Sequence, residues 1–298
     1  MQPVQRAYLE LHIAVFLFGF TAILGDLISL PALSLVWWRV ALTCLSLLFF
    51  IRLNEIFRKI PRKHFWQFTG IGIIVALHWI AFYGSIKLAN ASIALICLAT
   101  ISFFTSLIEP AVMGYKVRMY ELALGLLIIP GMWLIAGATE VGMQAGLWAG
   151  ILSAFLASIF AVLNKKLIEK ADSFSITFIE LGSAWLFLSL LLPFVFFFQP
   201  DWKFVPQGLD WFYLLVLALL CTTLAYVLSL RALRHLSAFI SNLTINLEPV
   251  YGILMAVFIL KDNEELTPDF YLGGAIILMA VFSYPFLKKW SRRREKKI

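Results

Sequence analysis

The stretch that decides the fold runs from Phe174 to Phe198 and reads FSITFIELGSAWLFLSLLLPFVFFF, with Glu180 as its one ionisable side chain. A helix needs about 20 predominantly apolar residues to cross the hydrocarbon core of a bilayer. The strands of a membrane barrel alternate apolar and polar residues, whereas this run is continuous. The stretch therefore predicts a helix that spans a membrane.

Nine further apolar segments of similar length lie on either side of this stretch. We expect spans at 8–28, 32–53, 65–86, 91–113, 119–138, 146–164, 209–229, 237–260 and 269–287. The first has only Arg6 before it and no small-residue cleavage site, so we expect an uncleaved helix and not a signal peptide. The pattern predicts an all-α polytopic membrane protein with ten transmembrane helices.

The composition points the same way. Of 298 residues, 62% are hydrophobic and 14% are charged, and the mean hydropathy is +0.91, whereas soluble domains carry about 25% charged residues. These values exclude a soluble enzyme, a disordered chain and a secreted disulfide scaffold. Cys44, Cys97 and Cys221 all lie inside apolar runs, without the spacing of metal ligands. We expect no metal site and no cofactor.

The basic residues predict how the chain is oriented. Most of the 24 Lys and Arg residues fall in segments on the same side as the N-terminus, including the 52–63 loop and the C-terminal tail. Three fall on the opposite side: Lys87, Lys203 and Lys261. Because Lys and Arg are enriched in cytoplasmic segments, both termini are predicted to be cytoplasmic, in the inner or plasma membrane of the cell. The net charge of +7 then suits anionic lipid, and we expect no nucleic-acid partner.

Ten spans divide into two sets of five, and an odd number of spans per half gives the halves opposite orientations. Weak sequence matches support a repeat of about 145 residues: Trp66 with Trp211, and Ser92 with Ser237. We therefore expect two inverted five-helix repeats, at 1–140 and 141–298, as in many secondary transporters.

A repeated dipeptide does not fit that spacing. Glu109-Pro110 and Glu248-Pro249 are closer together than the repeat length, and Glu248 lies mid-span whereas Glu109 lies near the end of its span. The two pairs are therefore predicted not to be equivalent.

Several motifs resemble those of EamA-type proteins of the drug/metabolite transporter superfamily. They are Trp38-Arg39, Ala91 to Ala94, Ser237-Ala238, Asn246 to Val250, the acidic turn from Asp262 to Glu265, and Gly273-Gly274. The chain departs from that family at Phe103-Phe104, where proline is common. The resemblance implies ten helices in two inverted halves around a central cavity. It also implies alternating access, with export or exchange of small metabolites such as amino acids.

Glu248 is the strongest candidate site residue, since an ionisable group in hydrocarbon is costly and needs a partner, a water-filled cavity or a function. Pro249 removes a backbone donor and loosens the helix beside it. Asn242 is expected on the same general face as Glu248, and Asn246 roughly opposite. These groups suggest a cation or proton site, and the alternative is a structural glutamate that accepts hydrogen bonds from a neighbouring helix.

Other intramembrane polar residues are weaker candidates. Arg39 lies about 10 Å below the outer surface at about 1.5 Å per helical residue, where it could snorkel outward, pair with a carboxylate or bind an anionic substrate group. Glu180 occupies the matching position of the second half, so the two could be gate charges, and the alternative is a glutamate satisfied by its packing contacts. His78 could carry a proton or form a structural hydrogen bond. Three aromatic residues are candidate cavity walls: Trp79, Tyr83 and Tyr226.

Three functions compete at this point. The first is a secondary transporter, an exporter of small metabolites such as amino acids, whose partners would be a small-molecule substrate, the lipid bilayer and, as a candidate, a coupled proton. The second is a membrane-embedded enzyme acting on lipid or isoprenoid, and the third is a flippase for a lipid-linked substrate or a passive facilitator. An enzyme should gather titratable groups at one membrane face, whereas this chain spreads single polar groups over different depths. That distribution favours transport and a protein that is not an enzyme. The sequence leaves the oligomeric state open.

Overall fold

The structure is a computed structural model that describes residues 2–136, 143–248, 250–251 and 268–295. Within these ranges the chain is helical and contains no strand. The helices are α1 (Pro3–Leu27), α2 (Ala32–Leu47), α3 (Leu53–Lys59), α4 (Arg62–Leu88), α5 (Ala91–Ala99), α6 (Ile101–Met113), α7 (Met119–Ala136), α8 (Gln144–Leu167), α9 (Ser173–Phe198), α10 (Asp210–Ala218), α11 (Ala225–His235), α12 (Ala238–Ile245) and α14 (Pro268–Glu295).

In the part of the chain that the structure describes, six helical stretches are long and apolar enough to cross a membrane. They are Pro3–Leu27, Arg62–Leu88, Ile93–Met113, Gln144–Lys170, Ser173–Phe198 and Asp210–His235. Two shorter apolar helices, Ala32–Leu47 and Met119–Gly131, accompany them. The chain is a multi-pass helical membrane protein.

The helix ends follow local sequence signals. Asn90, Asp172 and Ser237 each precede a helix, and each side chain accepts a hydrogen bond from the backbone N–H three residues later, at 2.8, 3.0 and 3.2 Å. Such caps satisfy donors that have no partner inside the helix. At the other end of α6, Gly114 takes a left-handed conformation with φ of 79°, which glycine adopts without steric cost.

Two predicted spans in the first half of the chain differ from the observed helices, and in the second half α12 ends at Ile245, with 249 and 252–260 of the span expected at 237–260 outside the described residues. The segment expected at 32–53 ends early, because α2 stops at Leu47 and a turn at 48–50 leads into α3, whose polar residues carry the chain into the loop. The segment expected at 91–113 is interrupted at Thr100, whose hydroxyl donates to the carbonyl of Cys97 at 2.6 Å. Such a side-chain bond to the backbone competes with the regular helical pattern.

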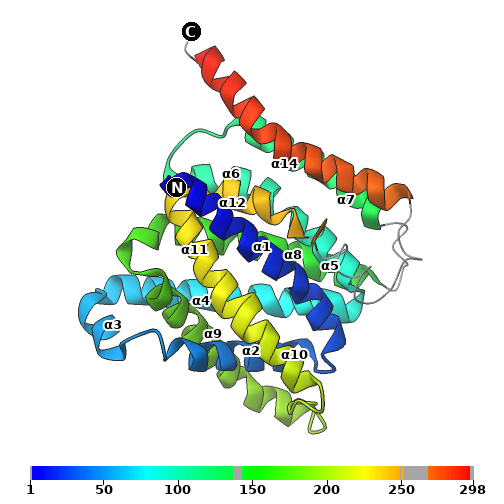
Figure 1. Ribbon diagram of the computed structural model, residues 1–298. Helices are drawn as coiled ribbons and strands as arrows, with labels where there is room; N and C mark the ends of the chain where they lie inside the picture. The colour runs from blue at the N-terminus through cyan, green and yellow to red at the C-terminus, as the bar shows by residue number, and fades with distance from the viewer. Residues whose placement is uncertain (1, 137–142, 249, 252–267, 296–298) are drawn as a thin grey trace.

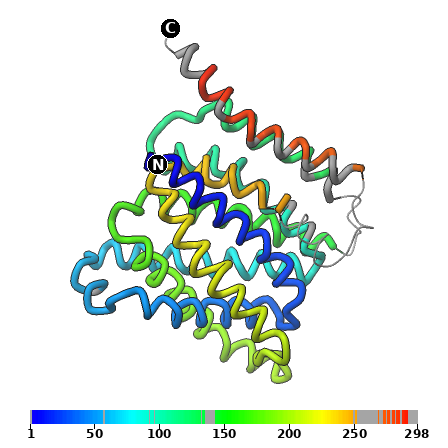
Figure 2. The backbone as a smooth tube through the Cα atoms, viewed as in Figure 1, coloured from blue at the N-terminus to red at the C-terminus, as the bar shows by residue number. Residues whose placement is uncertain are grey.

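The helices form one bundle with a peripheral pair (Figure 1). In that view α1 and α11 cross in front of α4, α8 and α9, while α7 and α14 lie against each other along one edge. The tube in Figure 2 shows the N-terminal end of α1, the end of α11 and the start of α12 close together on one side. Helices α4 and α9 approach each other closely at Gly72 of α4. A Cβ at this position would lie 2.0 Å from the carbonyl oxygen of Glu180, so glycine allows the two helices to touch there.

Candidate functional site

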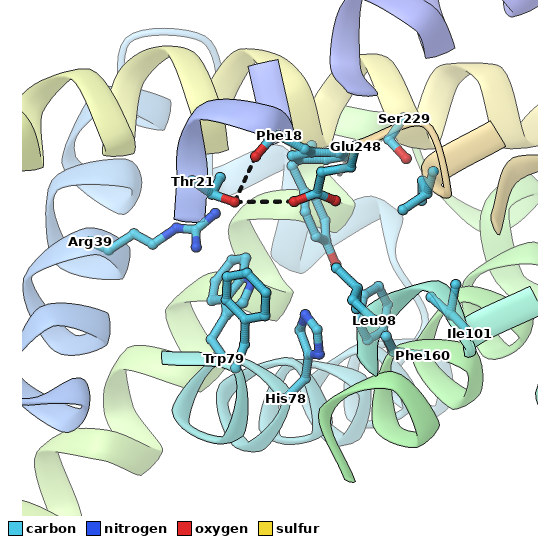
Figure 3. A pocket seen from close by; sticks show the side chains of 14 residues that line it. Phe18, Thr21, Arg39, His78, Trp79, Leu98, Ile101, Phe160, Ser229 and Glu248 are labelled. Carbon is cyan, nitrogen blue, oxygen red and sulfur yellow. Dashed lines mark hydrogen bonds between the residues drawn. The ribbon is translucent and has the colours of Figure 1, made fainter. Parts of the chain in front are cut away.

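A cavity of about 90 Å³, lined mostly by buried side chains, lies where several helices meet. Phe18 and Thr21 of α1, Arg39 of α2, and Glu248, three residues beyond α12, form part of its wall. Figure 3 shows Arg39 and Glu248 reaching toward the same space, with Trp79 and His78 of α4 on the side below them. The cavity therefore contains charged side chains of both signs inside a mainly apolar wall.

Arg39 is fixed by hydrogen bonds inside the protein and does not snorkel outward, since it is only 1% exposed. Its Nε donates to Thr222 Oγ1 at 2.7 Å, its Nη1 to the Tyr83 hydroxyl at 2.8 Å, and its Nη2 to the Cys221 carbonyl at 3.5 Å. Its guanidinium lies 4.0 Å from the ring centroid of Trp79, a cation–π contact. Arg39 is thus held in one orientation at the edge of the cavity.

The partner of Arg39 lies in an irregular part of the chain. Leu219–Leu224, between α10 and α11, form a π-helical turn. Within it, the Thr222 hydroxyl donates to the carbonyl of Leu217, five residues earlier, at 2.6 Å. Insertions of this kind in a helix are frequent at functional sites. Here the turn presents a hydroxyl and a carbonyl to the same guanidinium.

Glu248 has much weaker support from its surroundings. Among the described residues, Thr21 Oγ1 is the donor near its carboxylate, at 3.3 Å, and the single proton of that hydroxyl is shared with the closer Phe18 carbonyl, at 2.6 Å. Glu248 is 3% exposed. Among the described residues, the ion pairs within 4.0 Å do not include Glu248 or Arg39. The two opposite charges thus share the cavity without direct contact.

Most of the predicted site residues do gather here. His78, Trp79 and Tyr226 line the cavity together with Arg39 and Glu248, and Tyr83 reaches it through its bond to Arg39. His78 forms a structural hydrogen bond, the alternative to its acting as a proton carrier. Its Nδ1 lies 2.9 Å from both the hydroxyl and the carbonyl oxygen of Ser153.

Glu180 lies outside the cavity wall, directly behind Tyr226. The Tyr226 hydroxyl donates to Glu180 Oε2 at 2.6 Å, and Asn164 Nδ2 donates to the same oxygen at 3.2 Å. The Tyr226 ring is 6.3 Å from the ring of Trp79, centroid to centroid. Among the described residues, Glu180 and Arg39 form no ion pair with each other, and the rings of Tyr226 and Trp79 lie between them.

Asn242 and Asn246 do not join the cavity, and the expected faces of this helix are wrong. Asn242 Nδ2 donates to Thr105 Oγ1 at 2.7 Å, and Asn246 Nδ2 donates to Ser102 Oγ at 3.0 Å. Residues four apart share one helix face, so both amides face α6. Ile245 and Glu248 line the cavity instead.

The carboxylate of Glu109 adds a third contact to this interface, and the sequence reasoning missed its role. It accepts from the backbone N–H groups of Ala238 and Phe239, at 3.1 and 2.7 Å, and so caps the first turn of α12. Ser102, Thr105 and Glu109 of α6 contact the first turns of α12 and Asn246. We call this set of contacts the α6–α12 polar seam. Their recurrence at helical spacing on an apolar helix is the signal that could have revealed it.

Trp37 and Trp38 line a different cavity. They line an apolar groove of about 460 Å³ between α2, α3, α4 and α9, and Arg39 is not part of its wall. Their indole N–H groups donate at 2.8 Å to Ser189 Oγ and to the Phe204 carbonyl respectively. These two tryptophans thus have structural partners away from the charged cavity.

The sequence model of the EamA-like transporter family matches residues 5–137 and 144–284, nearly the whole chain. The chain belongs to the EamA-like transporter family. A curated relative, "Uncharacterized transporter YetK" of Bacillus subtilis (strain 168), is 28% identical over 134 residues, which are 44% of this chain and 39% of that protein. The match thus spans about two fifths of the length of this relative.

The fold of this EamA-like protein also has a solved counterpart. A structure described as "Crystal structure of protein" superposes with a TM-score of 0.73 at 16% sequence identity, and the alignment covers 97% of this chain and 98% of the other. At that identity the likeness establishes the fold and says nothing of the substrate.

Proposed function

We propose that this protein is a secondary transporter that moves a small zwitterionic metabolite, such as an amino acid, through the cavity between Arg39 and Glu248. The carrying observation is the unpaired arrangement of these two charges in one buried cavity. A guanidinium binds a carboxylate through paired hydrogen bonds, and a carboxylate binds an ammonium group. A substrate with both groups would supply an ion-pair partner for each of the two charged side chains.

The proposed architecture is ten membrane helices in two inverted repeats, 1–140 and 141–298. The two ranges matched by the family lie on either side of that boundary, which supports the division. The distribution of Lys and Arg supports cytoplasmic termini in the inner or plasma membrane. Export as the direction follows from the resemblance to the family.

The present cavity fits a closed stage of an alternating-access cycle. Its volume of about 90 Å³ is far below the roughly 300–1,000 Å³ of typical small-molecule sites, so substrate entry requires the helices to separate. The α6–α12 polar seam lies on the side where α12 begins, which the basic residues predict to be cytoplasmic. We infer that opening toward the cytoplasm breaks this seam.

Counterflow in proteoliposomes tests the proposal. Vesicles containing the purified protein are loaded with an unlabelled amino acid, and uptake of a labelled one is compared with uptake of the corresponding amine and carboxylic acid. We expect the zwitterion to exchange and the two truncated compounds to exchange poorly. Equal exchange of the amine, or no exchange by any amino acid, would overturn the zwitterion proposal.

Two substitutions assign the ends of the substrate. Arg39→Gln should weaken the preference for compounds with a carboxylate, and Glu248→Gln should weaken the preference for those with an ammonium group. Glu55→Gln is the matched control, because Glu55 is exposed on α3 and remote from the cavity. It should leave both preferences unchanged.

A further inference from the structure

Glu180 is a second buried carboxyl group that the proposed substrate site does not use. Its side chain is 0% exposed. It lies behind Tyr226, a residue of the cavity wall, whose hydroxyl donates a hydrogen bond of 2.6 Å to it. Within the described part of the chain, its oxygen Oε1 has no hydrogen-bond partner, and neither does Oδ1 of the adjacent Asn164. Both of these atoms are acceptors, so the cluster is short of a donor.

Among the described residues, no positively charged side chain forms an ion pair with this carboxyl group. Tyr226 from α11 and Asn164 from α8 are the described side chains that bond to it. From α4, Gly72 meets its backbone, and the titratable His78 is engaged with Ser153.

The cations on the neighbouring helices are also occupied elsewhere. Arg39 of α2 bonds to Tyr83 and Thr222. Lys165 of α8 donates to the carbonyl of Leu233, and Arg231 of α11 lies over the Phe174 ring. A carboxylate buried without a cation is costly, so an additional positive species is needed to neutralise it.

We propose that Glu180 is the proton-binding site that couples transport to a proton gradient, an inference that rests on the proposed transport function. One proton removes the buried charge and turns one of the excess acceptors into a donor. A hard metal cation fits less well, because such ions take about six or more oxygen ligands, and three side chains meet here. Sodium is accordingly an outcome of the test.

The contacts also give the proton a route to influence the substrate. Tyr226 donates to Glu180 with its hydroxyl and lines the cavity with its ring, 6.3 Å from Trp79. Trp79 in turn lies 4.0 Å from the guanidinium of Arg39. Tyr226 is therefore a positioning residue: when the charge on Glu180 changes, the hydrogen bond that orients this ring changes with it.

Separation from the cavity distinguishes Glu180 from Glu248. Glu248 faces the space occupied by substrate, so its charge is tied to what the cavity holds. Among the described residues, Glu180 is connected to that space through Tyr226, so it can hold or release a proton while substrate is bound or absent. Two distinct sites that influence each other through Tyr226 are what coupling between two bound species requires.

Infrared difference spectroscopy on the protein in liposomes tests proton binding without any substrate. As the pH is raised from mildly acidic to mildly alkaline, we expect loss of a carboxylic-acid carbonyl band. The band should be absent in Glu180→Gln and present in Glu248→Gln, and Tyr226→Phe should shift its frequency by removing the hydrogen bond. An identical pH difference spectrum in Glu180→Gln would overturn the assignment.

A transport measurement then tests coupling. Glu180→Gln imitates the protonated carboxyl group, so counterflow should persist while accumulation driven by a pH gradient is lost. Accumulation in this variant equal to the original protein, or dependence on a sodium gradient in place of pH, would overturn the proposal. If no substrate is transported by the original protein, the proposed function fails, whereas the infrared result still decides whether Glu180 binds a proton.

The folded state of the variants needs an independent check. Thermal unfolding in detergent should show Glu180→Gln close to the original protein, because glutamine keeps the acceptor for Tyr226. Should it unfold, Tyr226→Phe serves in its place, since it removes the connection and leaves the carboxyl group. It should retain the pH-dependent band and lose the effect of pH on transport; retained pH-dependence of transport would contradict the relay.

Discussion

Glu109 and Glu248 each precede a proline in an apolar span, yet their surroundings differ. Glu109 gives both carboxylate oxygens to backbone N–H groups at the start of α12. Glu248 accepts one hydrogen bond, at 3.3 Å, and faces a cavity that also contains Arg39. A carboxylate whose oxygens are both occupied by the backbone holds helices together, whereas one with spare acceptor capacity beside a cavity is available to a ligand.

The sharpest test of this contrast is Glu248→Gln. Glutamine keeps the size and the bond from Thr21 but removes the charge that we propose for the ammonium group. Loss of a partner from a buried charged contact costs about 2–5 kcal/mol, so we expect transport efficiency to fall by about 100-fold, with a thermal unfolding midpoint close to that of the original protein. Full transport activity in this variant would return Glu248 to a structural role.

Glu109→Ala should show the opposite balance, with stability as the main loss. Hydrogen bonds to charged groups contribute about 1.5–3 kcal/mol each, and a helix cap about 1 kcal/mol, so we expect unfolding in detergent to become easier by about 2–4 kcal/mol.

The same substitution should also loosen the seam. In an Ile245→Cys background, which places a thiol on the cavity wall, labelling from the cytoplasmic side should become faster when Glu109 is changed. Unchanged stability together with unchanged labelling would show that the cap does not hold the two helices together.

A smaller effect is expected for the neutral contacts of the seam. Interhelical hydrogen bonds in membrane proteins average about 0.6 kcal/mol in double-mutant cycles. A cycle with Asn242→Ala and Thr105→Val should therefore give a coupling free energy near that value, measured by unfolding. A coupling indistinguishable from zero would mean that the 2.7 Å contact contributes packing without a net hydrogen-bond term.

The smallest effect is expected for a third glutamate, outside the spans. Glu55 bonds to Lys59 at 2.6 Å on the surface of α3, and the hydrogen bond and charge of Lys59 lower the pKa of Glu55. A lowered pKa stabilises the folded protein above the ordinary pKa of glutamate, and this contribution disappears as the pH falls through the lowered value. Glu55→Gln should leave transport unchanged and slightly reduce the dependence of stability on acid pH, because exposed ion pairs contribute little. A large loss of transport would contradict this assignment.

Apolar runs and short motifs along the chain were sufficient to predict the helical membrane class and the family. In hydrocarbon, every backbone N–H and C=O group must be hydrogen-bonded within its own helix. Long apolar runs such as Phe174 to Phe198 therefore predict membrane-spanning helices from the local sequence. Arg39 and Glu248 were identifiable for the same reason, because an isolated charge in such a run stands out.

The packing of the helices, in contrast, sets which side chains meet. Asn242 faces Thr105, Glu109 caps α12, and Tyr226 reaches Glu180. Many residues separate the partners along the chain in each case. Hydropathy fixes that a helix crosses the membrane but not its rotation, its depth or its breaks. Those quantities follow from packing between helices and from local devices such as Gly72 and the π-helical turn at Leu219–Leu224, and they set which polar atoms come within bonding distance.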